Sequence, residues 1–519
     1  MTEHQDKKSS RKSGAKASKA IRPLGGNETY QLAMYILDLY RGTSVICRYA
    51  IPPTMTVANA RSELMSTIRA AIARVVLKHP LLQVGVGKAE SRKPFFVPLD
   101  SLDLGQLITW RFIEGPVDED SLRETAQSEV DNKFDGLDSL PCWRVLILHP
   151  QYTDSLEIVF TFNHSHADGM GGKVFHEDLL QTLNAGITDE ERQQFDQNVV
   201  KLPDCTPRFT PTTPQLAKLP VTNGFIVKTL WDEMKPGMLR KDVTLATWAP
   251  ILTSLPYKTQ LRSFAVDAGT LTNILAACRK HKTTLTGLIH GLALVSLASR
   301  LDEHKAPAFE AATALDQRKF LPSSHPSYPG LDPKRTVANY VSLMGHGFDT
   351  QVVSEVRSKL NWKKTSNESL SDELAGLTWS AAAKVRREIQ ERLDLGLKND
   401  LIGLMKFIGD WRTQMKKDAR KPRQFSWLVT NLGVVDGQPG TGTTALSSAK
   451  DENWAIRRAQ FVLSTEVPSG VWMIAPFAVK DGPLCMTFSS QDGVVDVGLA
   501  EGFVGDIHRW LVQIGSTQS

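Results

Sequence analysis

The sequence is poor in cysteine, with five residues in 519 that lie far apart and form no C-x-x-C pair: Cys47, Cys142, Cys205, Cys278 and Cys485. This usage indicates neither a disulfide framework nor a zinc knuckle, and it favours a reducing compartment. No apolar segment follows the basic N-terminus, so we expect no secretory signal. The most apolar stretch, residues 287–301, is too short to cross a bilayer and contains His290 and Ser296. We therefore expect a cytoplasmic protein with no transmembrane segment.

Excess positive charge is also lacking, except at one end. Residues 1–22 carry seven basic and two acidic residues, so their charge of +5 accounts for the net charge of the whole chain. The remaining residues, the body of the protein, have 54 basic and 54 acidic side chains. A neutral body lacks the basic field that nucleic acids require, and we expect no nucleic-acid partner. Residues 1–21 are rich in Lys and Ser and are predicted to form a disordered basic tail. The tail is either simply solvated or attracted to an anionic surface or a nuclear import receptor.

Several common enzyme motifs are absent. Without G-x-S-x-G a serine hydrolase is disfavoured, and without G-x-x-x-x-G-K-[ST] there is no P-loop. Gly440-x-Gly442-x-x-Ala445 matches part of a dinucleotide fingerprint, but no strand precedes it and no helix follows, so we interpret it as a loop.

What is present is an ordinary globular composition, with 41% hydrophobic residues, long enough for several cores. Residues 203–220 hold five prolines without hydrophobic periodicity, which is typical of an interdomain linker. We therefore predict an N-terminal domain at 22–202, a linker at 203–222 and a C-terminal domain at 223–519, with the tail at 1–21 in front.

Both halves mix strands and helices, which predicts an α/β (α+β) fold. In the first half the patterns predict a helix at 60–79 and strands at 45–51, 95–98, 107–113, 143–148 and 155–162. In the second half they predict helices at 270–282, 287–301, within 383–420 and around Trp510, and strands at 261–266, 425–433, 461–467, 471–479 and 483–490. Residues 302–336 are rich in proline and charge, and we interpret them as a loop or insertion.

The most informative segment is 155–183, where a strand of alternating apolar residues ends at Asn163 and His164 and a glycine-rich turn leads into a helix. Polar groups between a buried strand and a buried helix cost about 1–3 kcal/mol each unless they have partners or a role. Gly169, Gly171 and Gly172 allow close backbone approach near the imidazole. His164 is therefore a candidate catalytic residue.

Residues 164–169, HSHADG, resemble the H-x-x-x-D-G signature of the CoA-dependent acyltransferase superfamily, which includes chloramphenicol acetyltransferase and the condensation domains of peptide synthetases. Four other segments resemble the fungal alcohol acetyltransferase branch: RPLGGNETY (22–30), KHPLL (78–82), PCWRVLIL (141–148) and TNLG (430–433). Together they span most of residues 22–519. The resemblance implies two chloramphenicol-acetyltransferase-like domains, each a mixed sheet with flanking helices, and a tunnel between them.

The resemblance also implies roles for single residues. His164 would act as the general base that takes the proton of an alcohol as its oxygen attacks the thioester of acetyl-CoA or another acyl-CoA. Acyl-CoA is then a co-substrate, and neither a bound cofactor nor a metal is expected. Asp168 would be structural and paired with an arginine, for which Arg22, Arg41 and Arg318 are the candidates.

Donors for the tetrahedral oxyanion are implied in two places. In the second half, Thr430 and Asn431 are candidates that line the tunnel, with Gly433 allowing close approach. In the first half, Gly169 offers its backbone N–H. The chain departs from the family pattern at Asn163, where many members have a second histidine, and it lacks the D-F-G-W-G of the plant branch.

The sequence thus predicts a monomeric acyl-CoA-dependent O-acyltransferase that acts on a small alcohol, by resemblance one of fungal secondary metabolism. Four alternatives stay open. In the first, the chain is a condensation-type acyltransferase that uses a carrier-protein thioester, and in the second it is an inactive homologue that only binds. In the third, it is a metal-dependent hydrolase that uses His164 and His166 with Asp168. In the fourth, the motif is no more than a polar loop that caps the following helix.

Overall fold

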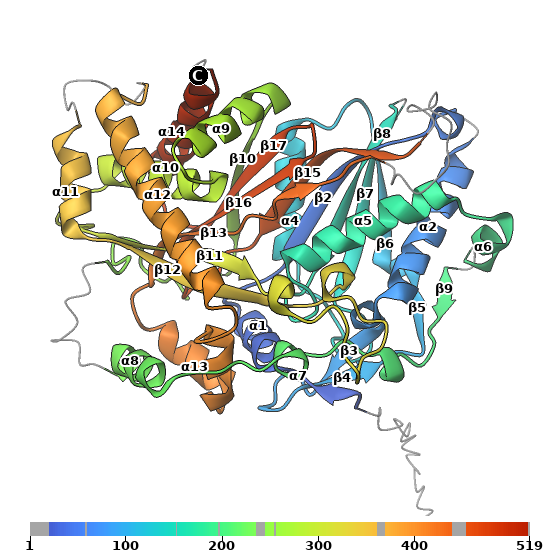
Figure 1. The fold of residues 1–519 in the computed structure, drawn as a ribbon. Coiled ribbons are helices and arrows are strands. Elements are labelled where there is room, and N and C mark those ends of the chain that lie inside the picture. The colour runs from blue at the N-terminus through green and yellow to red at the C-terminus, as the bar shows by residue number, and fades with distance from the viewer. Residues whose placement is uncertain are drawn as a thin grey trace, which may run out of the picture.

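A computed structural model describes residues 20–57, 60–151, 153–195, 198–234, 244–253, 256–360, 369–438 and 453–516. Residues 1–19 of the predicted tail and the Gly440–Ala445 segment lie outside these ranges. The described part consists of two large sheets covered by helices (Figure 1), which confirms the predicted α/β class. No helix within the described ranges has the length and apolar character needed to cross a membrane.

The first large sheet has five strands in the order β15-β2-β8-β7-β6. Their bounds are Ala455–Leu463, Thr43–Ala50, Ser155–Phe162, Trp143–Pro150 and Ile108–Ile113. Helices α2 (Arg61–Lys78) and α5 (Gly169–Ala185) pack on one face, and α4 (Glu119–Asp131) packs on the other. Alternation along β2 explains this sandwich, because Val45 and Cys47 point into the α2/α5 core whereas Ile46 points toward α4.

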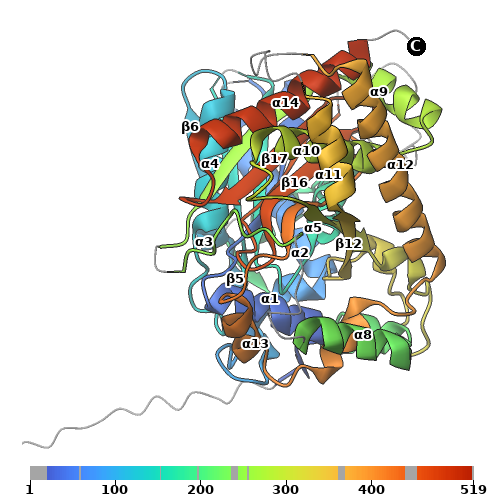
Figure 2. The same ribbon diagram turned by 90° about the vertical axis from the view of Figure 1, so that its left-hand side faces the viewer.

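The second large sheet has seven strands, β10-β17-β16-β13-β11-β12 with β14 paired to β16. Their bounds are Thr259–Val266, Leu484–Gln491, Gly470–Val479, Phe425–Val429, Phe309–Asp316, Val341–Phe348 and Val434–Val435. Five helices gather beside it at one end of the molecule (Figures 1 and 2): α9 (Ala268–Lys280), α10 (Leu285–Arg300), α11 (Thr350–Ser358), α12 (Asp372–Asp394) and α14 (Val497–Ser516). Thr284 caps α10, accepting a hydrogen bond from the amide of Gly287 at 3.2 Å.

β15 is the structural link between the two halves. It lies late in the chain, yet it pairs antiparallel with β2 from Leu463 opposite Thr43 to Ala455 opposite Ala50. The sheet that leads to His164 is therefore completed by a segment of the predicted C-terminal domain. Sequence periodicity predicts a strand but not its partner, and this explains why the predicted division at residues 202 and 223 does not follow the sheets. The division itself stays a prediction.

Shorter elements fill the opposite end of the molecule, where α1, α8 and α13 lie (Figures 1 and 2). The small sheets are β1-β4-β3 (Arg22–Pro23, Phe95–Pro98, Val84–Gly87) and β5-β9 (Ser101–Asp103, Val199–Lys201). The other helices are α1 (Gly26–Ile36), α3 (Leu104–Leu107), α6 (Asp189–Gln194), α7 (Thr213–Leu216), α8 (Asn223–Met234) and α13 (Trp411–Asp418). Single 3-10 turns are η1 (Pro53–Met55), η3 (Pro80–Gln83), η4 (Thr206–Arg208), η6 (Arg318–Phe320), η7 (Pro333–Arg335) and η8 (Leu401–Phe407). The predicted linker thus contains η4 and α7.

The interpretation of residues 302–336 as a loop or insertion is wrong. They contain β11, which lies between β12 and β13 inside the second sheet, followed by η6 and η7. β11 has the sequence FEAATALD, and alanine and acidic residues have low strand propensity, so its sequence gives a weak signal. Tertiary burial overrides that propensity, since Phe309, Ala311 and Ala312 are fully buried.

Candidate active site

The turn between β8 and α5 carries the HSHADG motif at the end of a buried strand, as predicted. β8 ends at the fully buried Phe162, and α5 begins at Gly169. Asp168 caps α5, because its Oδ1 accepts a hydrogen bond from the amide of Gly171 at 2.7 Å. The helix-capping interpretation thus describes part of the geometry. It does not account for the rest of the turn.

Asp168 is also held by Arg318 of the second half. The guanidinium makes a bidentate pair with the carboxylate, at 2.7 Å to Oδ2 and 2.9 Å to Oδ1, and both side chains are buried. The amide of Tyr340 donates to the same Oδ2 at 2.8 Å. Burial by itself lowers the pKa of Arg318, but the carboxylates of Asp168 and Asp316 outweigh it and raise this pKa above the ordinary arginine value. The structure thus selects Arg318 from the three candidate partners.

The other two candidate arginines have different partners. Arg22 donates to both carboxylate oxygens of Glu28 at 2.7 Å. Arg41 lies 3.4 Å from the carboxylate of Asp38 and over the ring of Tyr257. Both therefore stabilise regions outside the motif turn.

His164 lies in a nearly closed position with one side of its ring held. The residue is 8% exposed, and its ring lies 5.8 Å from that of Tyr40. The amide nitrogen of Asn339 is 2.7 Å from the His164 backbone oxygen, to which it donates, and 3.3 Å from the ring Nδ1. Among the described residues nothing hydrogen-bonds the Nε2 of His164. Nε2 is therefore the nitrogen that remains available to a substrate.

The neighbouring polar residues of the turn are structural. Asn163 accepts hydrogen bonds from the amide and the hydroxyl of Ser165 at 2.9 and 2.7 Å, which shapes the turn. His166 is fully buried, lies edge-on against Phe96, and has its Nδ1 3.0 Å from the Ser165 hydroxyl. Burial lowers the pKa of His166 to about 4. Within the described ranges, no group of three or more His, Cys, Asp or Glu side chains is arranged to hold a metal ion.

At Gly169, side chains of the second half pack directly against the backbone of the motif. A Cβ on this residue would lie 2.5 Å from Phe461 of β15 and 2.6 Å from Leu432, distances that side chains do not tolerate. Leu432 belongs to the TNLG segment, so that segment packs against the first turn of α5. The glycine is required for this close approach.

The TNLG residues themselves divide into two kinds. Asn431 is held at both ends of its amide, since one N–H of its Nδ2 donates to the Thr286 hydroxyl at 3.1 Å and its Oδ1 accepts from the amide of Gly433 at 2.7 Å. The hydroxyl of Thr430 makes no hydrogen bond in the described part of the chain, although its amide bonds to β16. Gly433 has a φ of +72° and open space around its Cβ position. Glycine permits this left-handed backbone, and close approach of a substrate at Gly433 stays a prediction.

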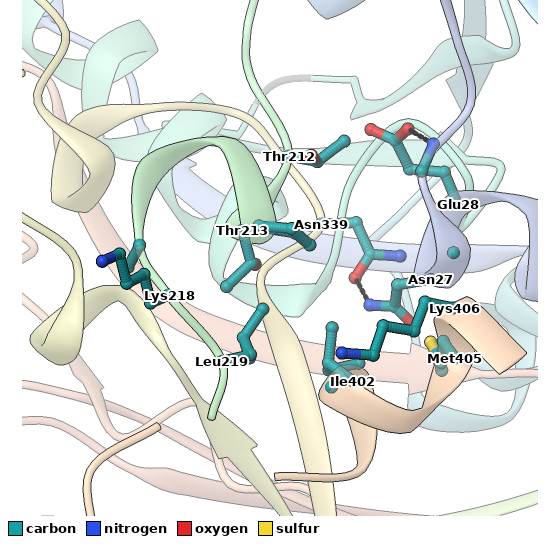
Figure 3. Close-up of a pocket in the computed structure, with 15 residues that line it drawn as sticks. Asn27, Glu28, Thr212, Thr213, Lys218, Leu219, Asn339, Ile402, Met405 and Lys406 are labelled. Atoms are coloured by element: carbon teal, nitrogen blue, oxygen red, sulfur yellow. Dashed lines mark hydrogen bonds between the residues drawn. The ribbon is translucent and has the colours of Figure 1, made fainter. Parts of the chain in front are cut away.

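A cavity of about 240 Å³ opens beside Asn339, the residue that contacts the turn between β8 and α5 (Figure 3). Six of the side chains that line it are Asn27, Leu219, Asn339, Ile402, Met405 and Lys406. They come from α1, the segment after α7, the segment just before β12, and η8, so both halves contribute. Asn339 belongs to the cavity wall and to the His164 contact at once, and this places the histidine directly behind the wall. Whether Thr430 and Asn431 line a tunnel stays a prediction.

Further ties hold the second half against α5. Lys173 donates to the backbone oxygen of Val434 at 2.6 Å, and burial lowers the pKa of this lysine. One helical turn later, Arg335 pairs with Glu177 at 2.6 Å and also with Asp178. The HSHADG turn and its helix are thus fixed to the second half at several successive positions.

Sequence reasoning missed Asn339 and Asn27. Asn27 lies in the RPLGGNETY segment, but the resemblance implied no role for it, and Asn339 follows a stretch with the composition of a loop. Only the three-dimensional pairing of β11 with β12 brings Asn339 to the histidine. A correct assignment of β11 would have been the one usable signal.

The chain is similar to known proteins in family, sequence and structure. The family model described as "Alcohol acetyltransferase" matches residues 124–442, more than half of the chain. The probable alcohol acetyltransferase FCK4 of Fusarium pseudograminearum is 26% identical over 507 residues, covering 96% of each chain. The probable alcohol acetyltransferase crmB of Aspergillus fumigatus is 22% identical and covers 91% of this chain and 96% of its own.

Solved structures show the same fold at lower identity. The TRI3 trichothecene 15-O-acetyltransferase of Fusarium sporotrichioides superimposes with a TM-score of 0.68 at 13% identity, covering 95% of each chain. The first condensation domain of the calcium-dependent antibiotic synthetase gives a TM-score of 0.53 at 11% identity, covering 96% of this chain and 97% of its own. The two-domain architecture of condensation domains and of TRI3 is therefore the architecture of this chain.

Proposed function

The chain belongs to the alcohol acetyltransferase family and is an acyltransferase, and from that premise we propose that it moves an acetyl or related acyl group from acyl-CoA to a small alcohol, with His164 as general base. The observation that carries this proposal is the environment of His164. The ring is buried at a strand exit, Asn339 contacts one side of it, and Nε2 is free within the described residues.

The chemistry uses this free nitrogen. In the tautomer that carries the ring proton on Nδ1, Nε2 of His164 takes the hydroxyl proton while the alcohol oxygen bonds to the thioester carbonyl carbon. The tetrahedral oxyanion then collapses, the carbon–sulfur bond breaks, and the CoA thiolate receives the proton from the imidazolium. An imidazole suits both steps because its ordinary pKa near 6.5 leaves it mostly neutral at pH 7 yet able to accept a proton.

Two groups are suited to stabilise the oxyanion. The Gly169 amide belongs to the first turn of α5, whose N–H groups have no acceptor within the helix and whose dipole favours negative charge. Thr430 has a hydroxyl without a partner in the described part of the chain, whereas both ends of the Asn431 amide are occupied. We therefore favour Gly169 and Thr430 over Asn431 as donors, each of which contributes a factor of about 10²–10³ in rate when correctly placed.

Asp168 acts in this proposal through geometry. Its carboxylate is saturated by Arg318, Gly171 and Tyr340, so it has no capacity left for substrate. The acceptor is proposed to be an alcohol of secondary metabolism, by analogy with the structural relative TRI3, a trichothecene 15-O-acetyltransferase.

The deciding experiment measures thioester consumption and ester formation with purified protein, a series of acyl-CoAs and a panel of alcohols. We expect release of free CoA that depends on the alcohol and yields one ester per thioester consumed. Activity should be unchanged by EDTA, since no step above needs a metal. An EDTA-sensitive activity restored by zinc would favour the metal-dependent hydrolase, and the absence of any thioester turnover would favour the binding homologue.

A further inference from the structure

Five of the eleven large hydrophobic side chains that are exposed in the described part of the chain come from two short segments, 223–231 and 395–407. Val227 and Trp231 of α8 are 66% and 58% exposed, and Phe407 of η8 is 58% exposed. The other two are Leu395 and Leu401. These segments are a small share of the chain, so exposed apolar surface is concentrated in them.

The two segments adjoin each other. The amide of Thr222, the residue before α8, donates to the Oδ1 of Asn399 at 2.8 Å, and the amide of Asn399 donates to the backbone oxygen of Pro220 at 2.8 Å. The exposed residues of 218–231 and 395–407 are called the α8 surface below. They lie at the end of the molecule that holds α8 and α13 (Figures 1 and 2).

Val227 and Trp231 share one face of α8, because residues four apart in a helix are neighbours. Phe225 and Ile226 of the same helix are half-buried, so α8 rests on the body through other side chains than these two. A tryptophan side chain is suited to a boundary between water and an apolar phase, since its ring is apolar and its N–H is polar. The outer face of α8 thus has the character of an interface.

Positive charge is concentrated at the same end. The segments 218–234 and 395–421, which contain α8, η8 and α13, carry nine lysines and arginines against five acidic residues. Because residues 23–519 have no net charge, the rest of the body has a net charge of −4. Residues 1–22 add +5 and join the body at β1, whose partner strand β4 lies at this end as well (Figure 1).

An anionic lipid membrane matches both properties. Helices that lie on membranes combine apolar and tryptophan side chains, which enter the headgroup region, with basic side chains, which contact anionic headgroups. Lysine is depleted in protein–protein interfaces, so its abundance here favours a membrane over a protein partner. We propose that the α8 surface docks on anionic membranes, with Val227 and Trp231 inserted among the headgroups and with the lysines and residues 1–22 held by the negative charge.

Co-sedimentation with vesicles tests the proposal. The wild type should bind vesicles of phosphatidylcholine with about 30% phosphatidylserine at least about tenfold more tightly than vesicles of phosphatidylcholine alone. Raising NaCl to about 0.5 M should remove most of this difference, because salt screens the charges. Binding to neither vesicle would overturn the proposal and leave a protein as the partner. Equal binding to both would overturn it as well, since charge would then have no role.

The apolar contact is tested with the double variant Val227→Ser, Trp231→Ser. Its partition onto the anionic vesicles should fall about tenfold or more, because two apolar side chains no longer leave water on binding. The matched control is Val497→Ser, Val512→Ser, which removes two exposed valines of α14 at the other end of the molecule and should leave the partition unchanged. Equal losses in the two double variants, or no loss in the first, would contradict the proposal.

The charge contact is tested with Lys228→Gln, Lys398→Gln, two exposed lysines of the α8 surface. Each lysine near a membrane contributes about fivefold, so binding should weaken about twentyfold. Lys280→Gln, Lys305→Gln is the control, since these exposed lysines lie at the end of α9 and after α10, and it should bind as the wild type does.

Two further results would exclude the α8 surface as the docking site. One is that both lysine pairs behave alike. The other is that deletion of residues 1–19 abolishes a binding that neither double variant of the α8 surface affects. Since no measurement here depends on catalysis, failure of this proposal is distinct from failure of the function proposed above.

Discussion

Two turns follow buried strands and meet near His164, yet they are built differently. In the turn after β8, the carboxylate of Asp168 has three partners, and it is buried with Arg318. In the turn after β13, the Thr430 hydroxyl has no partner among the described residues, and Gly433 adopts a positive φ with open space around it. The turn after β8 is thus fixed around a buried ion pair, whereas the turn after β13 keeps a hydroxyl and a glycine that no described side chain covers.

The largest effect is expected from removing the His164 imidazole, the proposed base, from the turn after β8. His164→Ala should lower kcat by at least about 10²-fold, because a positioned general base contributes about 10²–10⁴. Thermal unfolding should change little, since the polar contact that the ring makes within the described residues is the long 3.3 Å approach of the Asn339 amide nitrogen to Nδ1. Steady-state kinetics and a melting curve test this. A variant with wild-type turnover would mean that another group takes the proton.

The rigidity itself is tested by comparing a buried with a half-exposed arginine. Arg318→Met leaves the buried carboxylate of Asp168 without its counter-ion and should lower the free energy of unfolding by about 3–5 kcal/mol. Arg335→Met, whose side chain is 40% exposed, should cost about 1 kcal/mol or less, because Asp178 keeps Lys78 and His79. Urea unfolding of both variants gives the two values, and similar losses would show that burial is not what distinguishes the two pairs.

A single methyl group added to each turn compares close packing with backbone strain. Gly169→Ala drives a Cβ into Phe461 and Leu432 and should destabilise the protein by about 1–3 kcal/mol, with a loss of kcat because the turn must shift. Gly433→Ala meets no neighbour within the described residues and should cost about 1–2 kcal/mol through its positive φ alone, with a smaller effect on kcat. Melting curves and steady-state kinetics of both variants give these values. If Gly433→Ala is the more damaging to kcat, the freedom of that turn is itself needed for catalysis.

The smallest effect concerns the pH dependence of the rigid turn. Burial lowers the pKa of His166 from 6.5 to about 4. Between pH 4 and pH 6.5 this histidine is therefore mostly protonated in the unfolded chain and mostly neutral in the folded chain. Stability from this residue is therefore complete above pH 6.5 and declines as the pH falls, by about 1 kcal/mol at pH 5.5. In His166→Gln the difference in unfolding free energy between pH 8 and pH 5.5 should shrink by that amount. An identical pH dependence in both proteins would show that the histidine is solvated.

The motif and its setting are predictable from sequence because they are local. Alternation, glycine and helical spacing encode the strand, turn and helix between 155 and 185, and this is enough to put His164 at a strand exit. Sequence reasoning reaches Arg318 only as one of three candidates, since its choice depends on a contact 150 residues away along the chain. It misses Asn339 altogether, because β11 has the composition of a loop and the neighbourhood of β12 is lost with it.

The pairing of β15 with β2 has a consequence for how this protein reaches its native state. The central strand of the first sheet, β8, leads to His164, and the edge strand of this sheet is residues 455–463. Until that segment has been synthesised, one side of β2 has unpaired backbone groups. Truncated products that end before this segment would expose that edge and be prone to aggregate. The turn that carries His164 is therefore supported by a complete sheet only in a nearly full-length polypeptide.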